Sequence, residues 1–131
     1  MTPLENLHYA IGQLAYAVAH IDGRVQKEER QKFHDIVLAE LRGGDYAFDI
    51  SDIIFQILDK DKQDAATAYD WAIKEFRLNS HYLSPELKGA FTRILEMIAK
   101  AYPPVLQEER DLIDRFKKEM ASLKGDPTYY K

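Results

Sequence analysis

The sequence contains no cysteine, and this absence excludes several kinds of site. Disulfide bonds, zinc–thiolate centres and a cysteine nucleophile are all ruled out, and the absence fits a reducing compartment. Runs of about 18 apolar residues, which a membrane helix requires, are also missing. The first residues, Met1–Asn6, lack the basic and apolar regions of a signal peptide. We therefore expect a cytoplasmic protein without direct membrane insertion.

An excess of positive charge is missing as well. The 131 residues include 18 lysines and arginines against 22 aspartates and glutamates, so the net charge is −4. Nucleic-acid binders concentrate basic residues on one face, and attachment to anionic lipid needs basic clusters, so neither partner is expected. The sequence also lacks the P-loop, dinucleotide-binding, zinc-protease and serine-hydrolase motifs. We accordingly assign no catalytic or cofactor-binding residue from motifs.

Proline and glycine are scarce, with five and six residues, and no linker rich in them divides the chain. Apolar residues instead recur at spacings of three and four, as they do on one face of a helix. The first such run consists of Leu4, Leu7, Ile11, Leu14, Val18 and Ile21. This pattern favours a compact all-α bundle of six to seven helices. We expect one domain over residues 1–125 and a loose C-terminal tail, 126–131, in which Tyr129 and Tyr130 are candidates for docking.

Residues that favour helix starts and ends define six expected helices. By residue number, these helices cover about 3–20, 26–42, 50–58, 63–78, 85–102 and 105–125. Thr2 and Glu5 have the spacing of a capping box, and Ser84-Pro85-Glu86 supplies a hydroxyl cap, a proline and an acid. The residues expected in the core include Leu14, Val18, Phe33, Ile94, Ile98 and Phe116.

An offset of 80 residues aligns two predicted helical hairpins with each other. Val18 aligns with Ile98, and the triplet Glu28–Arg30 aligns with Glu108–Arg110 without a gap. A repeated helix–turn–helix unit, packed about a pseudo-twofold axis, accounts for this agreement. Chance agreement between two amphipathic hairpins is the alternative.

The segment Ala19–Arg30, AHIDGRVQKEER, carries a family resemblance. A small-residue helix, an Asp-Gly turn, a β-branched residue and a Glu-rich helix start resemble the signature of the tellurite-resistance protein TerB family. A second such element near the C-terminus, here Val105–Arg110, is also typical of that family. The resemblance implies an all-α fold of about seven helices, acidic turns linked to divalent cations, and a loose association with stress and membrane-linked processes. The second turn departs from the pattern at Tyr102-Pro103, and tellurite resistance itself is not implied.

Asp22, Glu28 and Glu29 form the candidate metal site. A helical hairpin brings their carboxylates near one another, and Ca²⁺ and Mg²⁺ prefer oxygen ligands. The turn is not an EF-hand, because Phe33 occupies the position of the bidentate glutamate. The alternative is purely structural: Glu29 lies three residues after Gln26, as in a capping box, and both glutamates suit the positive end of a helix.

Two hypotheses for the function remain. The leading one is a non-enzymatic helical interaction module, modulated by a divalent cation and acting through a protein partner or a homodimer. The other is a metal-dependent enzyme that uses the acidic turn of Asp22, Glu28 and Glu29. Trp71 is either a partner-binding anchor or a partly buried residue, and partial burial is the expectation. The four histidines are His8, His20, His34 and His81. His20 and His34 could approach the Asp22 turn from two helices, which would allow zinc, but we expect them to be partly exposed residues on helix surfaces.

Overall fold

The computed structural model describes residues 2–19, 21, 27–41, 65–102 and 104–130. Within these ranges every regular element is helical, which confirms the all-α prediction. The elements are α1 (Pro3–Ala19), α2 (Lys27–Leu41), α4 (Ala65–Leu78), η1 (Ser80–Tyr82), α5 (Pro85–Ala101), α6 (Gln107–Ser122) and α7 (Pro127–Tyr130). The expected helix 50–58 lies outside the described residues.

The two strongest start signals act as the sequence predicts. Thr2 and Glu5 exchange hydrogen bonds, from the Thr2 N–H to Glu5 Oε1 at 3.0 Å and from the Glu5 N–H to Thr2 Oγ1 at 3.1 Å. This reciprocal pair is a capping box, and it lowers the pKa of the Glu5 carboxyl. At the start of α5 the Ser84 hydroxyl accepts a hydrogen bond from the Leu87 N–H at 3.1 Å, and Pro85 follows at the first helical position.

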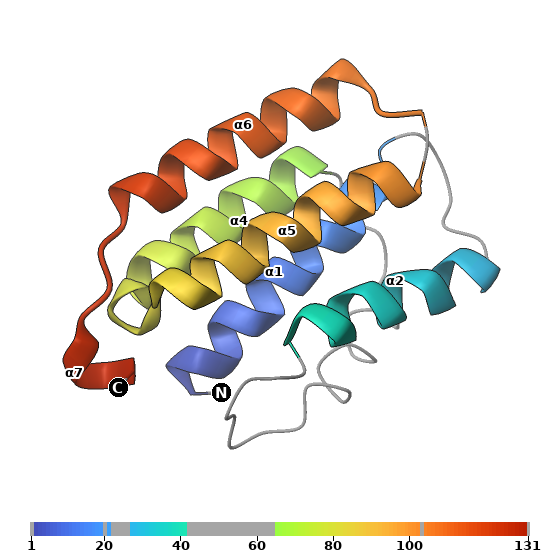
Figure 1. Ribbon diagram of the computed structural model, residues 1–131. Coiled ribbons are helices and arrows are strands. Elements are labelled where there is room, and N and C mark those ends of the chain that lie inside the picture. The colour runs from blue at the N-terminus through green and yellow to red at the C-terminus, as the bar shows by residue number, and fades with distance from the viewer. Residues whose placement is uncertain (1, 20, 22–26, 42–64, 103, 131) are drawn as a thin grey trace.

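Helices α1 and α5 run in one direction, and α2, α4 and α6 run in the opposite direction (Figure 1). Helix α1 packs against α4 and α5, while α2 and α6 both pack against α5. Helix α2 runs antiparallel to α5, because Lys32 near its start reaches Ala101 and Glu40 near its end pairs with Arg93. Helix α6 also runs antiparallel to α5, because Lys117 pairs with Glu96 and Leu123, just after the end of α6, accepts from Lys88 near the start of α5. Helix α5 is therefore flanked by a charged helix on either side of its outer face.

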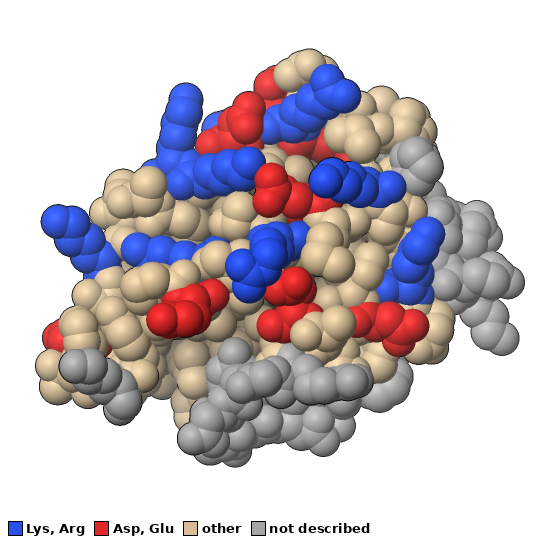
Figure 2. Space-filling model, in the orientation of Figure 1, with Lys and Arg blue, Asp and Glu red and all other residues tan. Residues whose placement is uncertain are grey.

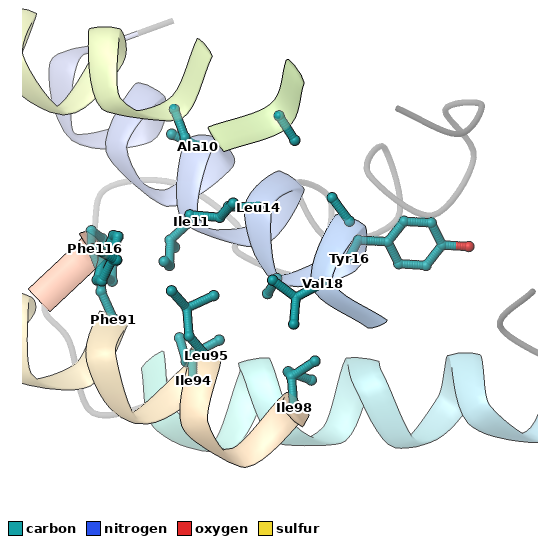
Figure 3. Packing of buried hydrophobic residues seen from close by; sticks show 14 of the residues in the cluster. Ala10, Ile11, Leu14, Tyr16, Val18, Phe91, Ile94, Leu95, Ile98 and Phe116 are labelled. Carbon is teal, nitrogen blue, oxygen red and sulfur yellow. The ribbon is translucent and has the colours of Figure 1, made fainter. Parts of the chain in front are cut away.

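Buried side chains of α1 and α5 form the centre of the core (Figure 3). Ile11 and Val18 of α1 point toward Ile94, Leu95 and Ile98 of α5. All six residues expected in the core are at most 1% exposed: Leu14, Val18, Phe33, Ile94, Ile98 and Phe116. The core prediction is thus confirmed.

Helix α6 closes the core from the other side of α4. The ring of Phe116 meets Phe76 of α4 edge to face, with centroids 5.6 Å apart. Arg77 pairs with Glu119 at 2.7 Å on the surface above this contact. The last turn of α6 ends at Ser122, three residues before the glycine expected to end it.

Helix α1 is buried more completely than its periodicity predicts. Every residue from Leu7 to Ala19 is buried, including His8 and Gln13. The one-faced pattern read from the sequence was therefore incomplete, because α1 is the central helix and has neighbours on several sides. Position within the bundle, rather than the local period, sets the burial of these residues.

The expectation of a loose C-terminal tail is wrong for the described residues. Residues Pro127–Tyr130 form α7, which packs against η1. The Asp126 N–H donates to the His81 carbonyl at 2.9 Å, and the Tyr129 ring lies 4.7 Å from the His81 ring. The alternative that Tyr129 docks is confirmed. His81 and Asp126 lie 45 residues apart in sequence, so no local pattern could show that tertiary contacts hold the tail.

The helix bounds are consistent with the 80-residue offset, but the packing of the two hairpins differs. Adding 80 to Lys27, the first residue of α2, gives Gln107, the first residue of α6. Helix α2, however, lies chiefly against α5, whereas α6 lies against α5 and contacts α4 through Phe116. Superposition of the hairpins about a pseudo-twofold axis stays a prediction.

Candidate interaction site

The predicted metal site falls largely outside the described residues. Asp22 lies in the undescribed stretch 22–26, as does the turn that it was expected to form. Glu28 and Glu29 lie in the first turn of α2, but their side chains are not among those described. Elsewhere in the described part of the chain, no three histidine or acidic side chains are grouped as metal ligands would be. The cation site therefore stays a prediction.

The burial of His8 was not predicted from the sequence. His8 is 2% exposed. Its Nδ1 atom lies 2.7 Å from the Leu4 carbonyl, which can only accept, so Nδ1 carries the proton. Burial lowers the pKa of His8 to about 4. His34 is partly exposed, as expected, His81 is also partly exposed, and His20 lies outside the described residues.

Trp71 is partly buried, which confirms that expectation. Its ring meets Tyr9 of α1 edge to face, with centroids 5.8 Å apart. The indole is thus engaged within the molecule, between α4 and the central helix. The candidate site lies on another surface.

A groove between α5 and α6 provides such a surface. Its volume is about 390 Å³, within the range of natural ligand clefts. Ala99 of α5, Val105 of the connecting segment and Ile113 of α6 supply its apolar lining. Because α5 and α6 are antiparallel neighbours, residues 14 positions apart in sequence form one continuous surface.

One end of the groove carries charges of both signs, the carboxylates of Glu96 and Asp114 and the ammonium of Lys117. Lys117 Nζ lies 2.9 Å from Glu96 Oε2, across the two helices. This hydrogen bond and the charge of Glu96, with a smaller contribution from Asp114, raise the pKa of Lys117. Lys117 therefore stays protonated at neutral pH and is committed to the carboxylates beside it.

The other end of the groove carries two positively charged side chains that are in no ion pair within the described residues. Lys100 and Arg110 line the groove and are exposed. Throughout the described ranges, neither side chain forms an ion pair. Lys100 lies in the last turn of α5, where a cation favours the helix, but Arg110 lies near the start of α6, where a cation opposes the helix dipole. Stabilisation of α6 thus does not account for Arg110.

Helix α5, which forms one wall of the groove, is tied to both of its neighbours. On the α2 side, Arg93 Nε donates to Glu40 Oε1 at 2.8 Å, and on the α6 side the Lys88 ammonium donates to the Leu123 carbonyl. These contacts hold α5 against α2 and against the end of α6. Figure 2 shows acidic and basic side chains interspersed over this face rather than a field of one sign.

Sequence reasoning did not identify this groove. It singled out Arg110 and Val105 only as members of the repeated element, and it placed the candidate site at the other hairpin. The signal that was present is the amphipathic α6, whose Ile113 lies three residues after Arg110. Which residues of α5 complete the surface depends on the register between the helices, and no local pattern encodes that register.

Comparison with known proteins adds no assignment. No family model, no characterised protein and no solved structure matches this chain. In the described residues, moreover, no helix combines the length and apolar character needed to cross a bilayer. The site must accordingly be interpreted from its own chemistry.

Proposed function

We propose that this protein is a non-enzymatic helical interaction module of the TerB-like type, which binds a protein partner or a second copy of itself. The observation that supports the proposal is the groove between α5 and α6. An apolar lining of Ala99, Val105 and Ile113 with charged residues at its edge is the arrangement of protein-binding grooves, where apolar contact supplies affinity and the charged rim supplies selectivity.

The chemistry of the groove favours binding over catalysis. Lysine acts as a base or nucleophile when its pKa falls toward neutrality, whereas the Glu96 carboxylate raises the pKa of Lys117. Asp114 lies on the exposed side of α6. The rest of the lining consists of aliphatic residues with Glu96, Lys100 and Arg110, and side chains of these kinds are suited to recognising a partner.

Modulation by a divalent cation is the second part of the proposal. It rests on the resemblance of Ala19–Arg30 to the TerB signature and on the acids Asp22, Glu28 and Glu29. Binding in the turn before α2 would act on the helix that packs against α5, the same helix that forms one wall of the groove. A cation would thereby influence the groove through α2 and α5.

Site-specific photo-cross-linking in the cell tests the interaction function. A photoreactive residue replaces Asp114 in the groove, and a second variant carries it at Lys118, an equally exposed position of α6 outside the groove. We expect adducts with one identified protein, or with a second copy of the chain, at position 114 alone. The purified partner should then bind the wild type in solution. Equal adducts at both positions, or none at 114, would contradict the proposal, and a metal-dependent turnover in a hydrolase screen would favour the enzyme hypothesis instead.

A further inference from the structure

Charged side chains are distributed unevenly along the groove between α5 and α6, and this distribution identifies the chemistry of its occupant. At one end Lys117 is paired with Glu96, and at the other Lys100 and Arg110 have no carboxylate partner within the described residues. The apolar residues Ala99 and Ile113 lie beside these cations, one residue before Lys100 and three residues after Arg110. A ligand in the groove therefore meets Glu96, Asp114 and the paired Lys117 at one end and two available cations at the other.

We propose that the groove binds an acidic amphipathic segment of a partner protein, with apolar side chains on the lining and carboxylates at Lys100 and Arg110. This proposal rests on the proposed function and deepens it by stating the chemistry of the partner. The guanidinium of Arg110 can hold a carboxylate through two parallel hydrogen bonds, while Lys100 adds a flexible point charge.

Charge complementarity favours this occupant over the alternatives. The whole chain carries a net charge of −4, so most acidic surfaces would be repelled at long range unless a local pair of cations receives them. A basic segment would be attracted by the net charge but would meet Lys100 and Arg110 without a compensating acid. Like charges brought together in an interface oppose binding, so the groove selects against a basic segment.

The dimensions of the groove suit a helix or an extended segment rather than a single buried molecule. A volume of about 390 Å³ accommodates a few large apolar side chains, and the groove lies along two antiparallel helices instead of inside the core. A partner helix would place apolar residues at spacings of three and four on the lining, as amphipathic helices do in other grooves. Its acidic residues would then follow on the edge that faces Lys100 and Arg110.

A pair of synthetic peptides tests the proposal on the full-length protein. The first is an amphipathic peptide with leucines at helical spacing and glutamates along its flank, and the second has lysine at every glutamate position. Titration is followed by fluorescence anisotropy and by amide chemical shifts of α5 and α6. We expect the acidic peptide to bind, with shifts centred on Ala99 and Ile113, and the basic peptide to bind at least about tenfold more weakly.

Two double variants separate the groove from the net charge. Lys100→Glu with Arg110→Glu reverses the groove cations, and Lys74→Glu with Lys118→Glu changes the net charge equally at exposed positions outside the groove. The groove variant should lower the affinity for the acidic peptide by about tenfold or more, and the control variant should lower it by less than about threefold. The milder pair Lys100→Gln with Arg110→Gln should also weaken it, and each variant is first checked for a wild-type helical spectrum.

Several outcomes would overturn the proposal. They are equal binding of the two peptides, equal weakening by the groove and control variants, or no binding of the acidic peptide to the wild type. Failure of the peptide with successful cross-linking at Asp114 would reject the acidic chemistry and leave the interaction function standing. Peptide binding that follows Lys100 and Arg110, with no cellular adduct at Asp114, would support the groove chemistry and reject the proposed function.

Discussion

The His8 ring of α1 meets the Phe91 ring of α5 edge to face, with centroids 5.7 Å apart and planes at 90°. A titratable side chain thus lies at the contact between the central helix and the helix that forms one wall of the groove. Its Nδ1–H is directed to the Leu4 carbonyl, which selects one neutral tautomer. The surroundings therefore favour the uncharged ring.

The buried His8 predicts a loss of stability in mild acid. Burial lowers its pKa from 6.5 to about 4, so between these values the unfolded chain binds the proton more readily than the folded one. The contribution of His8 is complete above the unfolded pKa and is lost as the pH falls toward the folded pKa. Urea unfolding at about pH 7.5 and at about pH 4 should differ by about 3 kcal/mol from this residue alone.

A matched pair of variants isolates that effect. His8→Leu should remove about 3 kcal/mol from the pH dependence of unfolding, because leucine does not titrate. His34→Leu is measured beside it, so that removal of a buried histidine is compared with removal of a partly exposed one. An unchanged acid slope in His8→Leu would show that His8 does not titrate in this way.

Truncation of the Phe116 side chain should lower the free energy of unfolding substantially. Its side chain is fully buried and contacts Phe76 across the α4–α6 interface. Phe116→Ala should reduce the free energy of unfolding by roughly 3–5 kcal/mol, because it removes apolar contact and leaves a cavity. Chemical denaturation measures the change, and Phe116→Leu should cost less. A loss below about 1 kcal/mol for Phe116→Ala would contradict the packing of α6 described above.

Substitution by alanine should have opposite effects at two glycines, Gly125 and Gly89. A Cβ at Gly125 would come within 2.2 Å of the Leu83 carbonyl oxygen, so the backbone segments must separate. Gly125→Ala should release α7, seen as faster amide exchange at Tyr129 and loss of its contact with His81. A Cβ at Gly89 meets only the Arg93 guanidinium, at 3.2 Å, which is a movable chain end. Gly89→Ala should stabilise α5 by up to about 1 kcal/mol.

Each of the two glycine predictions has its own contradicting outcome. Protection of Tyr129 unchanged in Gly125→Ala would mean that α7 does not need the close approach to Leu83. Destabilisation by Gly89→Ala would mean that the Arg93–Glu40 pair cannot adjust to the added methyl group. Urea unfolding of both variants, beside amide exchange, distinguishes local release of α7 from global loss.

The cation hypothesis predicts a change in melting temperature. Millimolar Ca²⁺ or Mg²⁺ should raise it, because a ligand held by the native state alone stabilises that state. Asp22→Asn should abolish the response with the helical spectrum intact, since asparagine also suits a turn. No melting shift and no binding heat with either ion would leave Glu28 and Glu29 as residues that stabilise the start of α2.

Local sequence determined where α1 and α5 begin. The contacts that start α1 and α5 are made within three residues, between Thr2 and Glu5 and between Ser84 and Leu87, so the chain specifies them without its other parts. The core positions of α1 and α5 were predictable for a related reason. A period of three to four residues places Val18 and Ile98 on an apolar face whatever that face packs against.

Tertiary structure decided which helix faces pack together and which buried sites and grooves that packing forms. The period of α1 identifies one apolar face, but burial of His8 follows from the presence of α5 beside it. The groove depends on the register of α5 with α6, which the Glu96–Lys117 pair and their packing set across 21 residues of sequence. The energy of such a contact is shared between distant segments, so it appears in no local pattern and exists only once the chain has folded.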